Sequence, residues 1–297
     1  MEELIVVALG GFCASMIDGA LGMGFGPTSS SILLSTGLSP AAVSTTVNLA
    51  KVATGIAGGV AHWRFGNVDR RLVIKLAVPG CAGALVGVTV LANVDGDNLR
   101  PTLAALLLVV AVRMLIRFSR PLPMQPDRPP VAGDRPVFDE RGTAVAAAAG
   151  GITNGLVGAW GPVVTPFLLH RGLAPRFAIG SVNTAEVAVA VVASGSLLAS
   201  LQGDGVEADI VLAMLIGGVL AAPIAAWVIR FIPPRGLGIA VSGLLLCTNV
   251  RELSTWAEIG AERWGLYATI VLACAYAGIR GKRLAGAAAA AAADDPA

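Results

Sequence analysis

Lys51 has the most unusual setting of any charged residue in this chain, because it lies near the middle of a long apolar segment. A charge at the centre of a bilayer costs roughly 3 kcal/mol or more on insertion scales, so the ammonium group must face a partner or a cavity. Ser44, Asn48 and Lys51 fall at positions i, i+4 and i+7, which places them on one face of a helix. Lys51 is therefore expected to be the counter-ion of an anion, or to form a structural ion pair with Glu186 or Asp18.

The surroundings of Lys51 are repeated further along the chain. Residues 21–51 reappear at 156–186 with a constant offset of 135 residues, so that Glu186 corresponds to Lys51. Glu186 has two interpretations: it is the salt-bridge partner of Lys51, or it is a proton carrier, since burial favours the neutral form of a carboxyl group. A duplicated, broken apolar segment of this kind predicts a membrane transporter.

Each copy of the repeat contains a break that is rich in glycine and proline. The first copy reads DGALGMGFGPT over residues 18–28, and such a broken backbone is tolerated at membrane depth only where protein or water satisfies it. Pro27 is expected to be the first residue of a half-helix, which leaves the N–H groups of residues 28–30 free to bind an anion. The hydroxyl groups of Thr28 and Ser29 would add donors.

The second break offers Gly158, Trp160, Gly161 and Pro162, with the N–H groups of residues 163–165 expected to be free. Two facing half-helix N-termini would form an anion site near the midplane of the membrane. The alternative is that the glycines only allow the helices to pack closely.

Asp18 and two aromatic residues in these breaks have alternative roles. Asp18, at the edge of the first break, either caps the broken segment or binds a proton. Phe25 and Trp160 occupy equivalent positions and either line the substrate path or pack in the core. The predicted substrate-binding residues are Gly24, Phe25, Gly26, Pro27, Thr28, Asn48, Lys51, Trp160, Gly161, Pro162 and Asn183. Glu186 and Asp18 are the candidates for proton coupling.

The composition predicts an integral membrane protein. Hydrophobic residues make up 55% of the chain and charged residues 13%, whereas soluble proteins average about 25% charged residues. The net charge of +2 is too small to indicate nucleic-acid binding. Neither the four cysteines nor the two histidines form a metal, redox or catalytic pattern. We therefore expect a multi-pass protein of the plasma or inner membrane with a small anionic substrate, no metal, no cofactor and no catalytic residues.

The charges of the loops predict the topology. The expected membrane spans are 40–61, 72–92, 101–118, 176–201, 209–231, 237–250 and 264–280, of which 237–250 is short. Loops 62–75 and 113–141 are basic, whereas loops 93–100 and 202–209 are acidic. Basic loops stay in the cytoplasm, so the N-terminus is expected outside and the C-terminus inside.

The Gly-rich stretches 4–36 and 143–169 then each begin and end on one side of the membrane, as re-entrant hairpins. We predict an all-α polytopic membrane protein with two inverted repeats, each a Gly/Pro-broken re-entrant segment plus three transmembrane helices, and one extra C-terminal helix. A simple nine-span arrangement is the alternative.

The expected organisation has five parts. They are the first transmembrane repeat (1–118), a cytoplasmic Pro/Arg-rich linker (119–142), the second transmembrane repeat (143–250), a C-terminal helix (251–283) and an Ala-rich tail (284–297). The tail is expected to be unstructured or the frayed end of a helix. Faces rich in glycine and alanine would allow a homodimer.

The paired motifs LGMGFGP…TGLSP…VN and LVGAWGP…RGLAP…VN resemble those of the sulfite exporter TauE/SafE family of membrane transporters, over residues 4–280. The resemblance implies secondary transport of a small anion such as sulfite or an organosulfonate, usually outward. Ala159 and Trp160 stand where the family has glycines, which leaves the substrate open. An anion channel and an intramembrane enzyme are the alternative functions, although the sequence shows no nucleophile–base pair for an enzyme.

Overall fold

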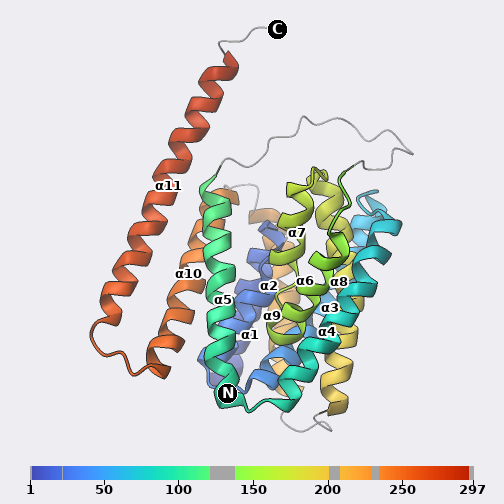
Figure 1. Ribbon diagram of the computed structural model, residues 1–297, viewed down its shortest axis with the longest axis vertical. Helices are drawn as coiled ribbons and strands as arrows, with labels where there is room; N and C mark the ends of the chain where they lie inside the picture. Colours follow the sequence, from blue (N-terminus) through green and yellow to red (C-terminus); the bar gives the residue numbers. More distant parts are fainter. Residues whose placement is uncertain (1, 22, 121–137, 201–207, 229–233, 294–297) are drawn as a thin grey trace.

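The computed structural model describes residues 2–21, 23–120, 138–200, 208–228 and 234–293, and the regular secondary structure within them is helical. The helices are α1 (Glu2–Leu21), α2 (Phe25–Ser35), α3 (Pro40–Arg64), α4 (Arg70–Asn93), α5 (Gly96–Ser119), α6 (Thr143–Val157), α7 (Gly161–His170), α8 (Pro175–Ser200), α9 (Ala208–Val228), α10 (Pro234–Trp256) and α11 (Arg263–Ala293). Figure 1 shows one bundle, with α11 leaning away from the other helices. Most of the predicted linker 119–142 and of the loop 202–209, and the last residues of the tail 284–297, lie outside the described residues.

Four helices are long and apolar enough to cross a membrane. They are α4, α5, α8 and α10, while α1, α6 and α9 contain shorter apolar stretches within the described residues. Apolar helices of this length are what a bilayer core about 30 Å thick requires. The all-α, polytopic character predicted from the sequence is confirmed.

Two predicted boundaries shift near the C-terminus. The short span 237–250 is part of α10, which continues through Arg251 and Glu252, because both are good helix formers and lie near the end of the helix. The predicted C-terminal helix 251–283 therefore divides, because residues 251–256 belong to α10 and α11 begins at Arg263. α11 continues into the alanine run as far as Ala293, because alanine has the highest helix propensity.

The two Gly/Pro-broken segments fold as helical hairpins. α1 and α2 form the first hairpin, in which Gly10 lies against the side chain of Ile32. α6 and α7 form the second, and the backbone N–H of Asp139, just before α6, donates to the carbonyl oxygen of Arg171, just after α7, at 3.1 Å. Each hairpin begins and ends at one end of the bundle: the first at the lower end in Figure 1, where the N-terminus lies, and the second at the upper end.

Each hairpin packs closely against a helix of the other half of the chain. α1 runs along α9, and α6 runs along α4. Both contacts place a glycine against a backbone carbonyl: a Cβ at Gly217 would overlap the carbonyl oxygen of Ala8, and a Cβ at Gly151 would overlap that of Gly80. Small residues let helix backbones approach in this way. The larger hydrophobic cluster draws buried residues from α1 through α9. A second cluster joins α5, α10 and α11, with Ile17 of α1 and Met23.

Gly151→Ala is expected to lower the melting temperature of the purified protein, because the new methyl group would meet backbone that no side-chain movement can displace. Overpacking of this kind costs about 1–3 kcal/mol of unfolding free energy. Gly58→Ala in α3 is the matched control, since nothing lies within 4 Å of its Cβ position. Thermal unfolding in detergent measures both variants, and equal melting temperatures would argue against tight α4–α6 packing.

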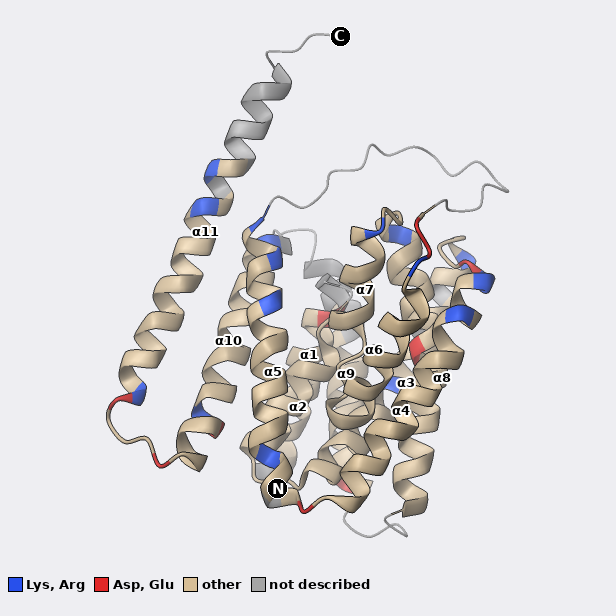
Figure 2. Cartoon of the chain, viewed as in Figure 1, with Lys and Arg blue, Asp and Glu red and all other residues tan. Residues whose placement is uncertain are grey.

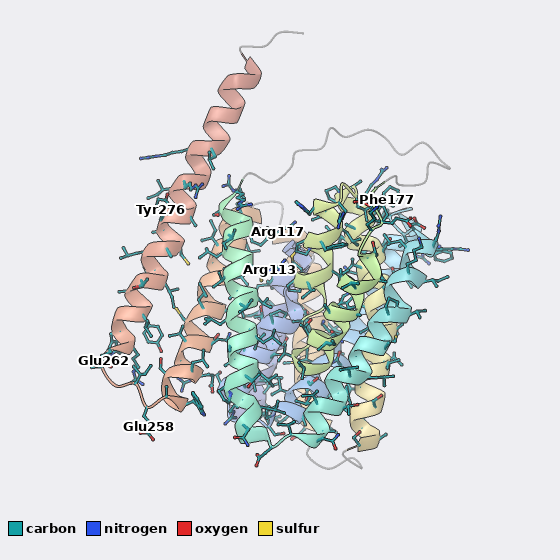
Figure 3. All side chains as sticks on the ribbon, in the orientation of Figure 1. Arg113, Arg117, Phe177, Glu258, Glu262 and Tyr276 are labelled. Carbon is teal, nitrogen blue, oxygen red and sulfur yellow. The ribbon has the colours of Figure 1, made fainter. Side chains whose placement is uncertain are left out.

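The two ends of the bundle differ in charge. Figure 2 shows many Lys and Arg residues at the upper end, where the second hairpin begins and ends. Figure 3 labels Glu258 and Glu262 in the lower turn between α10 and α11. At the upper end Lys75 pairs with Glu140, and the hydrogen bond from Lys75 lowers the pKa of the Glu140 carboxyl group. The upper end is therefore the basic one.

Candidate functional site

The two hairpin breaks meet in the interior of the bundle. α6 ends at Val157 because Gly158 adopts a left-handed conformation, with a φ of 66°, that a side chain would strain. Gly26, in the first turn of α2, lies directly against this backbone, and a Cβ there would overlap the carbonyl oxygen of Gly158. Ser30 Oγ donates to the carbonyl oxygen of Val157 at 2.7 Å across the same junction. The broken backbone of one hairpin is therefore satisfied in part by the other.

The first half-helix starts earlier than the sequence predicts. α2 begins at Phe25, whose backbone N–H donates to the Asp18 carboxylate at 3.3 Å, so that Asp18 caps the broken end. The N–H of Thr28 already donates to the carbonyl oxygen four residues earlier, at 3.1 Å. The prediction of free N–H groups at 28–30 is wrong, because the acidic cap starts the helix two residues earlier. Pro27 lies inside the first turn, where proline is tolerated.

The second half-helix starts at Gly161, with Pro162 in its first turn. The N–H groups of Val163 and Val164 both donate to the carbonyl oxygen of Trp160 at 3.1 Å. The prediction of free N–H groups at 163–165 is therefore also wrong, because the helical hydrogen bonds begin at Trp160. The positive group at the junction is a side chain.

That side chain is Lys51 of α3, which is only 5% exposed. Its Nζ donates to the carbonyl oxygen of Gly158 at 2.5 Å and to Oδ1 of Asn154 at 3.2 Å. Its third partner is Glu186 of α8, with which it forms an ion pair. Three acceptors match the three protons of an ammonium group, so Lys51 holds both halves of the chain together at the junction.

A network of polar side chains extends from Lys51 along the same face of α3. Asn48 and Asn154 are fully buried, and Nδ2 of Asn154 donates to Oδ1 of Asn48 at 2.7 Å. Ser44, one turn further along, donates to the carbonyl oxygen of Gly155 at 2.7 Å. The face that the sequence assigns to Ser44, Asn48 and Lys51 therefore contacts the second hairpin.

Two carboxyl groups share this interior with one ammonium group. The side chain of Glu186 is 18% exposed, whereas that of Lys51 is 6% exposed. Asp18 lies close enough to interact electrostatically with both. Full ionisation of the three groups would leave a net negative charge in a poorly solvated region, which a single bound proton would cancel.

The two aromatic residues of the breaks pack in the core. Trp160 is fully buried, and its Nε1 donates to the carbonyl oxygen of Val182 at 3.1 Å. Its ring fills the space that the missing side chain of Gly80 leaves on α4. Phe25 is also buried. In this conformation both residues therefore match the packing interpretation rather than the gating one.

Comparison with known proteins gives a further observation on the whole chain. A sequence model of a protein family, described as Sulfite exporter TauE/SafE, matches residues 7–251, which include both hairpins and the junction. The chain belongs to the TauE/SafE family. It is 41% identical over 254 residues to the probable membrane transporter protein YtnM of Bacillus subtilis (strain 168). The aligned region covers 85% of this chain and 83% of that relative. No solved structure matches.

Membership of the TauE/SafE family makes this chain an integral, multi-pass membrane transporter rather than an enzyme. The resemblance to this family that the two Gly/Pro motifs indicate is thereby confirmed. The family match spans both halves of the duplication, so the junction lies inside the matched region.

Asn154 is the residue of this TauE/SafE junction that the sequence did not reveal. The repeat indicated Asn183 instead, as the equivalent of Asn48, but Asn183 makes no side-chain hydrogen bond within the described residues. The reason is that Gly19 stands at the position equivalent to Asn154, so Asn183 has no second amide to pair with. An asparagine inside an apolar stretch was the available signal, since buried amides need partners.

Buried hydroxyl groups lie in both half-helices. The side-chain oxygens of Thr28, Ser29 and Thr165 are buried and have no hydrogen-bond partner among the described residues. Gly24 precedes them as the N-cap residue of α2. An unpaired buried hydroxyl costs roughly 1–3 kcal/mol, so these groups remain available to a polar ligand. In the described ranges, no group of three or more His, Cys, Asp or Glu side chains is placed to hold a metal ion.

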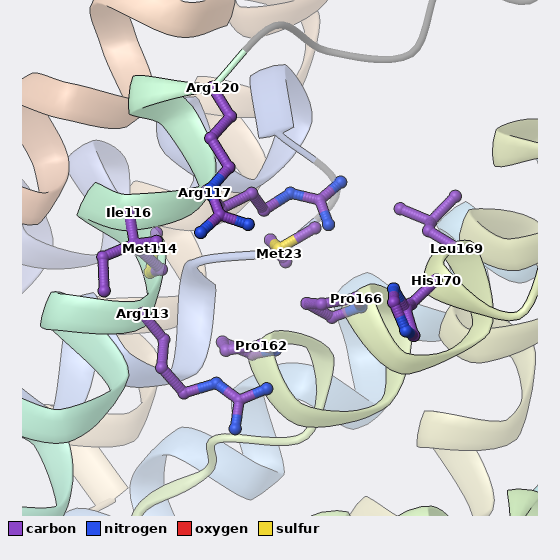
Figure 4. Close-up of a pocket in the computed structure, with 10 residues that line it drawn as sticks. All are labelled: Met23, Arg113, Met114, Ile116, Arg117, Arg120, Pro162, Pro166, Leu169 and His170. Carbon is purple, nitrogen blue, oxygen red and sulfur yellow. The ribbon is translucent and has the colours of Figure 1, made fainter. Parts of the chain in front are cut away.

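A cavity of about 540 Å³ opens beside the hairpin breaks at the upper end of the bundle. Figure 4 shows Arg113 and Arg117 of α5, together with Arg120 directly after that helix, lining it opposite Pro162 of α7. Figure 3 places Arg113 and Arg117 on the side of α5 that faces α7. From the sequence, these arginines indicate only topology. The spacing of Arg113 and Arg117 at i and i+4 is the signal that these two share one helix face.

Proposed function

We propose that this protein is a secondary transporter that exports small anions, such as sulfite or organosulfonates, and that the anion binds Lys51 where the two hairpins meet. The observation that carries the proposal is the buried ammonium group of Lys51 at the junction. A cation flanked by amide groups in a poorly solvated interior attracts a small oxyanion strongly. The family description names sulfite, which fits this chemistry.

Glu186 is already paired with Lys51 in this conformation, so an arriving anion must displace the Glu186 carboxylate from the Lys51 ammonium group. A carboxylate separated from its cation in a low-dielectric interior is costly unless it takes up a proton. Anion binding at Lys51 would therefore be accompanied by protonation of Glu186, the carboxylate that loses its cation, with Asp18 as a neighbouring acid. When no anion is bound, the ion pair with Glu186 would neutralise Lys51. The empty transporter could then change conformation without an unpaired charge in its interior.

The membrane potential favours export of a divalent anion in this scheme. One proton carried with a doubly charged oxyanion leaves a net negative charge, which a negative cell interior drives outward. For a singly charged sulfonate the same step is electroneutral and follows the gradients of solute and proton.

The two halves, 1–118 and 143–250, form an inverted repeat in this proposal, with the upper end in the cytoplasm. Support comes from the hairpins, which begin and end at opposite ends of the bundle, and from the matching α1–α9 and α4–α6 contacts. Basic residues gather at the upper end, as the positive-inside rule expects of a cytoplasmic face. In the nine-span arrangement the stretches 4–36 and 143–169 would each cross the membrane once, whereas α1 packs against α2 and α6 against α7, as in hairpins. A homodimer stays a prediction.

Glu186→Gln is expected to make transport of methanesulfonate independent of pH. In the wild type, flux should rise as the pH falls, because protonated Glu186 no longer competes with the anion for Lys51. The dependence on one bound proton approaches about tenfold per pH unit. Glutamine keeps the size of the protonated group, and methanesulfonate keeps its charge between acidic and neutral pH. Initial rates in proteoliposomes over a series of pH values measure the effect.

Asp209→Asn is the matched control, because Asp209 is an exposed acid at the start of α9, away from the junction. This control should keep the pH dependence of the wild type. A Glu186→Gln variant that also kept it would rule out proton uptake at Glu186. Wild-type proteoliposomes that transported neither methanesulfonate nor sulfite would refute the proposed function itself.

A further inference from the structure

Three arginines line the upper cavity with no carboxylate beside them. Arg113 and Arg117 project from α5, and Arg120 directly follows its last residue. The other lining residues are apolar except for His170. Within the described residues none of the three forms an ion pair, and Nε of Arg117 is buried without a hydrogen-bond partner. Cations that gather around a cavity without acidic partners raise the local concentration of anions. The arrangement is therefore suited to holding an anion.

The cavity stands between the basic end of the bundle and the breaks that meet at Lys51. Met23, which immediately precedes the N-cap of α2, and Pro162, in the first turn of α7, both line it. Figure 4 shows the side chains of Arg113 and Arg117 reaching toward this wall. An anion held here would lie next to both hairpin breaks.

We propose that this cavity is a second oxyanion site, here called the arginine vestibule (Arg113, Arg117 and Arg120), which captures the transported anion before it reaches Lys51. The inference rests on the proposed anion transport and adds a separate site to it. Guanidinium groups bind sulfonate and phosphate oxygens through pairs of hydrogen bonds. A volume of about 540 Å³ accommodates a small oxyanion together with water.

The lower end of the bundle does not carry the same charge. With the offset of the repeat, the three arginines correspond to Thr248, Glu252 and Thr255 of α10. Glu252 and Thr255 line a smaller cavity, of about 350 Å³, in which Arg100 is the positive residue. A cavity with one acid and one base attracts anions less than a cavity with three bases. The difference favours capture at the upper end and release at the lower end.

Two sources could supply the oxyanion: a dissolved solute, or the phosphate of an anionic lipid headgroup. The wall formed by the two hairpin breaks favours the solute, because a lipid headgroup held there would stand in the way of the junction. The vestibule is therefore assigned to the dissolved anion, and lipid binding is an outcome that the experiment distinguishes.

The transport experiment compares two variants that each lose three positive charges. The vestibule variant carries Arg113→Gln, Arg117→Gln and Arg120→Gln, and the control carries Arg64→Gln, Arg70→Gln and Arg71→Gln. The control residues are exposed and lie outside the cavity. With methanesulfonate supplied at the upper face, the half-saturating concentration should rise about tenfold in the vestibule variant, at an unchanged maximal rate. The control should change by less than about twofold, because its charges lie outside the cavity and are screened from it by salt.

Replacing the same three arginines with lysine should raise the half-saturating concentration less than replacing them with glutamine, because the charge is retained although the paired hydrogen bonds are lost. A purely structural role for the guanidinium groups would instead damage both vestibule variants alike. Equal half-saturating concentrations for the vestibule variant and the control would overturn the proposal.

A binding experiment separates the vestibule from the junction. Lys51→Met protein in phosphatidylcholine nanodiscs should still bind methanesulfonate, and adding the three vestibule substitutions should abolish this binding. Absence of binding to Lys51→Met, or binding of phosphatidylglycerol with none of methanesulfonate, would overturn the assignment. Failure of the proposed function has a different signature: the wild type would show no flux, while methanesulfonate binding to Lys51→Met would persist and support the vestibule.

Discussion

Lys51→Met is expected to reduce anion transport at least about hundredfold, to the background of empty liposomes. Nζ of Lys51 is bonded to the Gly158 carbonyl oxygen, to Asn154 and to Glu186, so it is the cation at the point where both hairpins meet. A hundredfold loss corresponds to about 2.7 kcal/mol. Hydrogen bonds to charged groups are worth about 1.5–3 kcal/mol, so loss of this one interaction is sufficient. Initial rates with methanesulfonate and with sulfite measure the effect.

A loss of transport by Lys51→Met must be separated from a loss of folding. Removing one partner of a buried ion pair costs about 3–5 kcal/mol, because the other charge is left unpaired. The double variant Lys51→Met, Glu186→Gln removes both charges and should regain thermal stability without regaining transport. If the double variant transported at the wild-type rate, Lys51 would not be the cation that binds the anion.

The second large effect is expected from Gly26→Ala, which should lower transport to near background although no charge changes. The new Cβ would overlap the carbonyl oxygen of Gly158 and would lie 3.1 Å from Nζ of Lys51. Because the Gly158 atoms are backbone of the other hairpin, no rotamer change relieves the overlap, and the two breaks must move apart. Overpacking costs about 1–3 kcal/mol, and the movement would also disturb the 2.5 Å hydrogen bond from Lys51 to Gly158.

Gly195→Ala is the matched control for Gly26→Ala. Gly195 lies in α8, the helix that carries Glu186, and nothing lies within 4 Å of its Cβ position. This control should transport and melt like the wild type, and both quantities are measured on both variants. Wild-type flux in Gly26→Ala would show that transport does not depend on the close contact between the hairpins.

The pairing at the junction is partly readable from the sequence. A lysine in the middle of an apolar segment must find a partner, and the repeat aligns Lys51 with Glu186. The ion pair between them is one of the alternatives that the sequence leaves open, and the structure contains it. The residues at which the two half-helices begin cannot be predicted from the sequence in this way. Glycine and proline mark where a helix breaks, but the Asp18 cap decides at which residue the next one begins.

The sequence by itself determined that the protein is a multi-pass membrane transporter of the TauE/SafE family, because hydropathy, duplicated motifs and family resemblance are properties of segments read along the chain. Only the tertiary structure decided that Asn154 rather than Asn183 supports Lys51 and that Trp160 packs in the core. It also decided that the arginines of α5 face a cavity. These outcomes depend on which helices pack side by side, and the partners concerned can be more than a hundred residues apart. Contacts of that kind arise from the packing of whole helices, which no local pattern of residues encodes.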